Sequence, residues 1–182
     1  MALPSIMHRF EIELSDVDEG RYESLDLRVA RHPSEGLPYL MTRVLVWTLR
    51  RGDDLDMSKA GLSTGEAPAL LAYDLTGRMR HWVDIGRPSA ERIHKASKTA
   101  QHVSIYTYKN GQSLVDALNR ATVHRRSDID LFEVDADFLE ALARTLDRSN
   151  HWTIVRTDGA IYVTAGETTL ETTFIRWPLE AG

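Results

Sequence analysis

Apolar and polar residues alternate along the first part of the chain. Between Phe10 and Leu14 every second residue is apolar, and the pattern returns between Leu25 and Val29, after an acidic stretch that ends at Gly20. A two-residue period is typical of strands that bury one face. The sequence therefore predicts an antiparallel hairpin near its beginning.

A helical period follows this hairpin. Apolar residues recur every three or four positions from Leu37 to about Arg50, and Pro38 is compatible only with the first turn of a helix. The same kind of reasoning predicts three more helices, in residues 89–100, 113–123 and 136–148.

Short extended runs separate the helices. Residues 69–75 and 80–85 flank a turn around Gly77, and residues 102–108 and 129–134 are predicted to be single strands. Three more strands are predicted in residues 151–156, 160–164 and 168–175. The order of elements predicts an α/β fold, a mixed β-sheet flanked by helices.

Composition supports an ordinary globular protein. Hydrophobic residues make up 42% of the 182 residues and charged residues 27%, values typical of a folded chain. The length predicts a single domain over residues 1–182 that folds as a monomer. The absence of cysteine excludes disulfides, thiolate metal sites and a cysteine nucleophile. No segment has the roughly 18 apolar residues of a membrane span, so we expect a cytoplasmic protein without membrane association.

Basic residues are unevenly distributed. The net charge is −5, which is unlike a protein that binds nucleic acid with its whole surface. The stretch from Arg78 to Lys98, however, is rich in Arg, Lys and His and contains only two acids, Asp84 and Glu91. It is either a solvated helix face with ordinary ion pairs or a local basic patch for nucleic acid. His81, within it, is interpreted as a surface histidine.

Turn geometry predicts that two acids converge. If the turn centres on Gly77, Asp84 lies as far after it as Leu70 lies before it, so Glu66 reaches the same end of the hairpin. Paired carboxylates beside Lys or Arg suit Mg²⁺ (or Mn²⁺) and a phosphodiester. A carboxylate in the apolar strand that carries Asp84 needs a partner, and Arg80, Arg92 or a metal ion would serve.

Five short blocks of the chain resemble conserved blocks of the YaeQ family of bacterial proteins. They are ARHPSE (Ala30–Glu35), GLSTGE (Gly61–Glu66), DLTG (Asp74–Gly77), HWVDIGRP (His81–Pro88) and ERIHKAS (Glu91–Ser97). The resemblance extends from the first strand to Arg176-Trp177. It implies a restriction-endonuclease-like PD-(D/E)XK core, made of a helix, a three-stranded meander, a helix and a strand, preceded here by the N-terminal β-hairpin.

The resemblance also implies a set of site residues. Glu35, Glu66 and Asp84 would be catalytic metal ligands, although Glu35 would equally suit the positive end of the first helix. Gly86 stands where the superfamily pattern has its lysine, two residues after Asp84.

Some superfamily members place the catalytic lysine on the following helix, which implies Lys95 or Lys98 in that role. Two functions are therefore expected as alternatives. The first is Mg²⁺-dependent phosphodiester hydrolysis of nucleic acid. The second is a catalytically inactive binding module for nucleic acid or a protein partner. In either case Arg80, Arg87 and Arg92 are the expected phosphate contacts.

Overall fold

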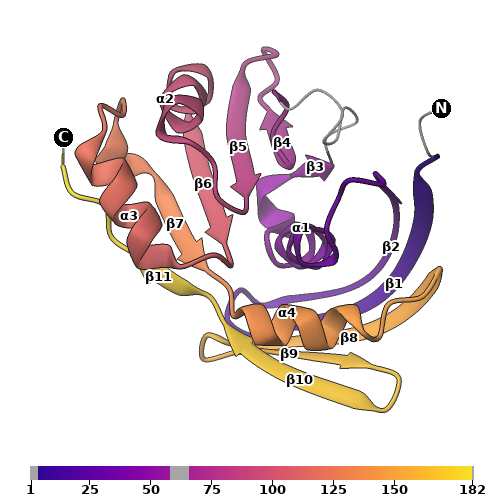
Figure 1. The fold of residues 1–182 in the computed structure, drawn as a ribbon. Coiled ribbons are helices and arrows are strands. Elements are labelled where there is room, and N and C mark those ends of the chain that lie inside the picture. The colour runs from indigo at the N-terminus through magenta and orange to yellow at the C-terminus, as the bar shows by residue number, and fades with distance from the viewer. Residues whose placement is uncertain (1–3, 58–65, 182) are drawn as a thin grey trace. The chain divides into compact units, whose positions relative to one another are not determined.

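Two compact units make up the chain. The computed structural model describes residues 4–57 and 66–181 (Figure 1). Unit 1 consists of Met1–Met41 and Asp135–Phe174, and unit 2 of Thr42–Val134 and Ile175–Gly182. Each contains one β-sheet, and each is described by itself below. The expectation of a single domain stays a prediction.

Unit 1 is built on a five-stranded sheet with the order β10-β9-β8-β1-β2. The strands are β1 (Ile6–Asp16), β2 (Arg21–Arg31), β8 (Ser149–Thr157), β9 (Ala160–Ala165) and β10 (Thr168–Thr173), and helix α4 (Ala136–Ala143) contacts β10. The antiparallel pairing of β1 with β2 confirms the predicted hairpin. On its other side β1 pairs in parallel with β8. Phe10 and Trp152 pack edge to face in the core, with ring centroids 4.9 Å apart.

Unit 2 is built on a six-stranded sheet with the order β11-β7-β6-β5-β4-β3. Its strands are β3 (Asp56–Met57), β4 (Leu70–Tyr73), β5 (Met79–Ile85), β6 (His102–Thr107), β7 (Asp130–Glu133) and β11 (Ile175–Trp177). Its helices are α2 (Ala90–Thr99), α3 (Gly111–Arg120) and the short 3₁₀ turns Arg51–Asp53 and Arg126–Asp128. Helix α1 (Leu37–Leu49) runs from the first unit into the second.

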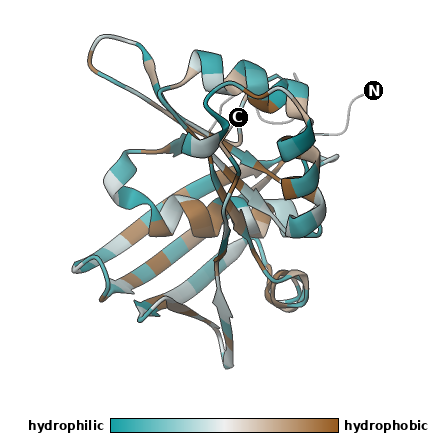
Figure 2. Ribbon diagram, turned by 90° about the vertical axis from the view of Figure 1, so that its left-hand side faces the viewer, coloured by the Kyte–Doolittle hydropathy of each residue, from teal (hydrophilic) through white to brown (hydrophobic). Residues whose placement is uncertain are grey.

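The centre of unit 2 is a parallel β5-β6-β7 sheet covered by α2 and α3. Residues of both helices and all three strands form one apolar cluster that includes Trp82, Ile93, Ile105, Leu118 and Leu131. Figure 2 shows hydrophobic positions recurring between hydrophilic ones along the strands and helices. Burial of these faces is the main stabilising contribution to the unit.

Arg126 links the C-terminal segment to the rest of this unit through hydrogen bonds. Its guanidinium is buried, and within the described residues it donates only to backbone carbonyls, those of Leu118, Asn119, Ala121, Glu180 and Ala181. Two of these acceptors lie in the C-terminal tail and three lie at the end of α3. One side chain thus holds both segments in place.

Two expectations about the sheet were wrong. There are two sheets instead of one, and the run 168–175 divides at Phe174 into β10 and β11, which belong to different sheets. The predicted helix 136–148 ends at Ala143. It ends early because the Asn150 side chain both accepts from the Asp147 amide and donates to the Asp147 carbonyl, at 2.8 Å each, which fixes a turn.

Across residues 4–57 and 66–181, every helix is too short or too polar to cross a lipid bilayer.

Candidate functional site

Asp84 is a buried carboxylate on the face of β5 that α2 covers. It is only 4% exposed, and Trp82, on the same face two residues earlier, belongs to the apolar cluster with α2. Arg92 of α2 meets it with two hydrogen bonds, from Nε to Oδ2 at 2.7 Å and from Nη2 to Oδ1 at 2.8 Å. This bidentate geometry is the strongest form of an arginine–carboxylate pair.

Arg92 has two further contacts that join the site together. Its Nη2 also donates to the backbone carbonyl of Ala67 at 2.8 Å, and its guanidinium carbon lies 5.3 Å from the centre of the Trp82 ring. The residue after Glu66 is therefore tied to the strand that carries Asp84. The backbone next to Glu66 thus lies at the same end of the hairpin as Asp84, and the convergence of the two carboxylates stays a prediction.

The register of this hairpin differs by one residue from the expected one. Leu70 pairs with Val83 and not with Asp84, because the pair of Tyr73 with Met79 centres the hairpin on Thr76, and a bulge between Ala72 and Tyr73 restores only one of the two positions of difference. Such a bulge adds one residue to one strand and moves every later pair. The shift leaves Glu66 and Asp84 at the same end.

Lys95 and Glu66 form the exposed edge of the site. Lys95 Nζ lies 3.9 Å from Glu66 Oε1, and the two side chains are 68% and 80% exposed. Lys95 follows Arg92 by three residues, close to one helical turn, so both cations lie on one side of α2. We call Glu66, Asp84, Arg92 and Lys95 the α2 cluster; it contains two carboxylates and two cations.

A divalent metal ion fits this cluster poorly. Both oxygens of Asp84 are already bound by Arg92, and the described residues contain no group of three or more His, Asp or Glu side chains arranged to hold a metal. Glu35 belongs to unit 1, where it is buried and accepts a hydrogen bond from the His32 amide at 3.3 Å. Its role as a metal ligand stays a prediction.

Backbone geometry explains the missing lysine at position 86. Gly86 has φ of +91°, a conformation that glycine adopts freely and other residues avoid. It forms the sharp turn from β5 towards α2. A lysine at this point would strain the backbone.

The other predicted site residues, Arg80, Arg87 and Lys98, are not part of the α2 cluster. Arg80 donates to the Asp53 carbonyl and lies 3.7 Å from the Asp54 carboxylate, so it is held by the turn after α1. Arg87 is exposed and donates to Ser113 Oγ at 2.8 Å. Lys98 is exposed in the last turn of α2.

The interpretation of His81 as a surface residue was wrong. It is 3% exposed, its Nε2 is 2.8 Å from Ser104 Oγ, and its Nδ1 is 4.0 Å from Asp53 Oδ2. Burial, followed by the nearby Arg50 cation, lowers the pKa of His81 to about 4, so the ring is neutral at pH 7. Ser104 is fully buried, so this trio lacks the accessible nucleophile of a serine hydrolase.

The same network continues to Tyr106. Arg50 donates from Nη1 to the Tyr106 hydroxyl at 3.0 Å and also pairs with Asp53. Burial raises the pKa of Tyr106. Strand alternation could have revealed this cluster, because His81 has the parity of buried Val83 and Ile85 within β5.

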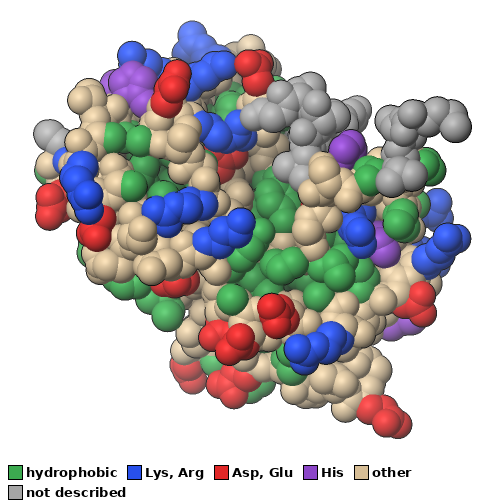
Figure 3. All heavy atoms as spheres, viewed as in Figure 1, with side chains coloured by type: hydrophobic (Ala, Val, Ile, Leu, Met, Phe, Trp, Pro, Cys, Tyr) green, Lys and Arg blue, Asp and Glu red, His purple; other side chains and the backbone are tan. Residues whose placement is uncertain are grey.

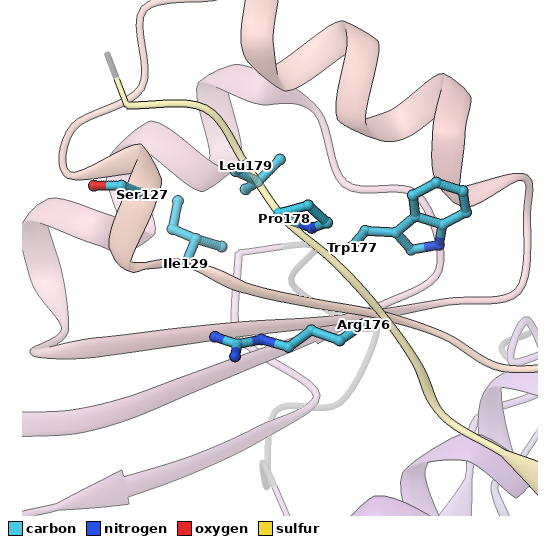
Figure 4. A pocket seen from close by; sticks show the side chains of 6 residues that line it. All are labelled: Ser127, Ile129, Arg176, Trp177, Pro178 and Leu179. Carbon is cyan, nitrogen blue, oxygen red and sulfur yellow. The ribbon is translucent and has the colours of Figure 1, made fainter.

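A shallow pocket of about 270 Å³ lies beside β11 (Figure 4). It is lined by Ser127, Ile129, Arg176, Trp177, Pro178 and Leu179. Arg176, the cation of this lining, already pairs with Asp130 at 2.7 Å. The pocket is therefore mainly a depression between the C-terminal segment and the turn before β7.

Comparison with known proteins gives one consistent family. The family model described as "YaeQ protein" matches residues 1–174. The YaeQ proteins of Escherichia coli (strain K12) and Salmonella typhi are 25% and 27% identical, over 97% of this chain and 98% of theirs. Among solved structures, the YaeQ protein of Pseudomonas syringae has a TM-score of 0.86 at 28% identity and covers 100% of both chains. That of Xanthomonas axonopodis pv. citri has a TM-score of 0.86 at 28% identity, over 97% of this chain and 99% of that one.

Proposed function

The chain belongs to the YaeQ family, and on this basis we propose that it binds nucleic acid on a PD-(D/E)XK-like scaffold without hydrolysing it. In this proposal the catalytic metal of the superfamily is replaced by the guanidinium of Arg92. Unit 2 thus keeps the framework of a nuclease and uses it for recognition.

The order of elements supports the scaffold. Strands β3, β4 and β5 are successive antiparallel neighbours, and α2 then leads to β6, which pairs in parallel with β5. Helix α1 precedes them in the chain. This order matches the helix, meander, helix and strand that the resemblance implies, which supports the proposed scaffold.

The observation that carries the proposal is the position of Arg92. It binds both oxygens of Asp84 and the Ala67 carbonyl, an oxygen set of the kind that a hard divalent ion would need. A guanidinium balances the charge of the acid, but it does not lower the pKa of a water molecule as a bound metal does. With Gly86 in the place of the lysine, the α2 cluster is better suited to hold the scaffold together than to cleave a phosphodiester.

The surface charge supports nucleic acid as the ligand. Figure 3 shows Lys and Arg side chains gathered over the part of unit 2 that carries α2 and α3. The chain as a whole has a net charge of −5, so this concentration of positive charge is local. Binding through such a surface falls steeply as salt concentration rises.

One observation favours a second candidate, a metal-dependent nuclease. Glu66 and Asp84 are each within reach of a cation on the same side of α2, which is the arrangement expected if Lys95 or Lys98 replaced the missing lysine. This candidate requires Arg92 to leave Asp84.

A paired binding and cleavage assay separates the two. Labelled single-stranded and duplex DNA and RNA oligonucleotides are titrated with the protein at low and moderate salt, and the same samples are examined for cleavage with Mg²⁺ or Mn²⁺. We expect salt-sensitive binding and intact oligonucleotides. Absence of binding at low salt contradicts the proposal, and metal-dependent cleavage that disappears in Asp84→Asn replaces it with the second candidate.

A further inference from the structure

Arg87 differs from several arginines of unit 2 because it does not pair with a carboxylate of the described residues. Several arginines of this unit pair with carboxylates: Arg50 with Asp53, Arg80 with Asp54, Arg92 with Asp84, Arg120 with Asp116 and Arg176 with Asp130. Arg87 instead donates to neutral oxygens, Ser113 Oγ at 2.8 Å and the carbonyls of Ser113 and Lys109 at 3.4 Å. Within residues 4–57 and 66–181, Arg87 forms no ion pair with a carboxylate.

Lys109 contacts Arg87 and also has no carboxylate partner among the described residues. Its backbone carbonyl accepts from Arg87, and its Nζ lies 5.8 Å from the centre of the Tyr108 ring. Its side chain is exposed, and among the residues that the structure covers it too has no carboxylate within pairing distance. The Arg87 guanidinium therefore contacts the backbone of Lys109, and within the described residues neither cation has a carboxylate partner.

The sheet topology explains why the two residues meet. Ile85 of β5 pairs with Tyr106 of β6 in parallel register. Arg87 and Lys109 follow these positions, so both lie where adjacent parallel strands end. In open α/β sheets this carboxyl edge is where ligands bind.

We propose that Arg87 and Lys109 form a phosphate-binding subsite that contacts the backbone of a bound nucleic acid strand. This inference rests on the proposed function and makes it specific. Arginine presents a planar set of donors that matches phosphate oxygens, and lysine adds a mobile point charge. Ser113 already holds the Arg87 guanidinium, so less side-chain entropy is lost when the phosphate binds.

The subsite also revises the expected phosphate contacts. Arg80 and Arg92 are engaged with acids and backbone carbonyls of the protein itself. Of the three predicted arginines, Arg87 alone keeps its charge uncompensated among the described residues, and its partner Lys109 lies far from it in the sequence. We therefore expect the bound nucleic acid strand to run across the carboxyl edge of β5 and β6 and not across the α2 cluster.

The test uses the full chain and a labelled single-stranded oligonucleotide, with Kd measured over a range of salt concentrations. Arg87→Gln and Lys109→Gln are each expected to weaken binding about tenfold and to reduce the slope of log Kd against log salt by about one. Arg120→Gln is the matched control, because it removes the same charge from an exposed side chain of α3 that is 3.9 Å from Asp116. It should leave Kd within about twofold.

The outcomes are distinct for the two proposals. If the wild-type protein binds and neither Arg87→Gln nor Lys109→Gln changes Kd or the salt slope, the subsite is wrong and the proposed function stands. If the wild-type protein does not bind, the proposed function fails. If Arg120→Gln weakens binding equally, the weakening comes from the general surface charge, and the proposed subsite is wrong. Both substituted side chains are exposed, and unchanged thermal midpoints verify that the variants fold.

Discussion

Arg92 donates to both carboxylate oxygens of Asp84, at 2.7 and 2.8 Å, while Asp84 is almost fully buried. A buried carboxylate is costly unless its charge is matched at close range. Here the matching charge comes from the helix that follows the strand, and the same guanidinium reaches the Ala67 carbonyl. Strand β5, helix α2 and the segment before β4 are thus joined by one side chain.

Replacing Arg92 should therefore destabilise the protein strongly. In Arg92→Met the apolar part of the side chain remains, but Asp84 stays buried without its counter-ion. We expect the free energy of unfolding to fall by about 3 kcal/mol, measured by urea denaturation. Lys95→Met is the matched control on the same helix, and it should cost less than about 0.5 kcal/mol because its pair with Glu66 is exposed. Equal effects of the two substitutions would contradict the role of Arg92 as the counter-ion of buried Asp84.

His81 should make stability depend on pH. The folded protein holds the pKa of His81 at about 4 because of burial and Arg50, whereas the unfolded chain has the ordinary value near 6.5. The unfolded state then binds more protons between these values, so stability is full above pH 6.5 and falls as the pH drops towards 4. The loss from this group is at most about 3 kcal/mol.

The contribution of His81 is isolated by difference. Urea midpoints are measured at several values between pH 7 and 4 for the wild type and for His81→Gln, which does not titrate in this range. Carboxylates titrate in both proteins and cancel. The wild type should lose more stability than the variant over this interval, and identical slopes would show that His81 does not resist protonation.

Gly111 has no room for a side chain. A Cβ at this position would overlap the Trp177 indole nitrogen and the Glu133 carboxylate, which are hydrogen bonded to each other at 2.8 Å. Gly111→Ala should lower the free energy of unfolding by about 1–3 kcal/mol and displace Trp177, which tryptophan fluorescence would detect. Gly36→Ala is the control, since its Cβ would come no closer than 3.9 Å to Pro38. If Gly111→Ala leaves the free energy of unfolding unchanged, the C-terminal segment that carries Trp177 moves at little energetic cost.

Arg126 should control the order of the C-terminal tail. Arg126→Ala removes donors to the carbonyls of Glu180 and Ala181 and to the end of α3. Amide hydrogen exchange is expected to accelerate in α3 and β11, with smaller changes in the strands of unit 1. Arg125→Ala is a neighbouring comparison, because its contacts are with the Ser97 and Ala100 carbonyls instead. Exchange that stays unchanged in α3 would remove this role from Arg126.

Local pattern was sufficient for most elements but not for their assembly. The alternation before Asp16 predicted the first hairpin, and the helical period after Leu37 predicted α1. The parallel pairing of β1 with β8 joins residues about 140 positions apart, such as Asp16 and Arg156. No short-range period contains that information, so the two sheets could not be separated from sequence.

The candidate site divides in a similar way. Because Asp84 lies in an apolar strand, the sequence predicts that it needs a partner, and Arg92 is one of the predicted partners. His81 was missed because residue type outweighed strand parity in the interpretation. Lys109 was missed because its proximity to Arg87 depends on the parallel register of β5 and β6, which a separate strand does not reveal.

The long-range partner of β1 also has a consequence for synthesis on the ribosome. The hairpin of β1 and β2 is made before β8, β9 and β10, which complete its sheet only after residue 149 has been made. Until then one edge of an eleven-residue strand has no native partner, and an open edge can pair with other chains. The nascent hairpin of β1 and β2 should therefore depend on protection by chaperones, and folding of unit 1 should be limited by the synthesis of β8, β9 and β10.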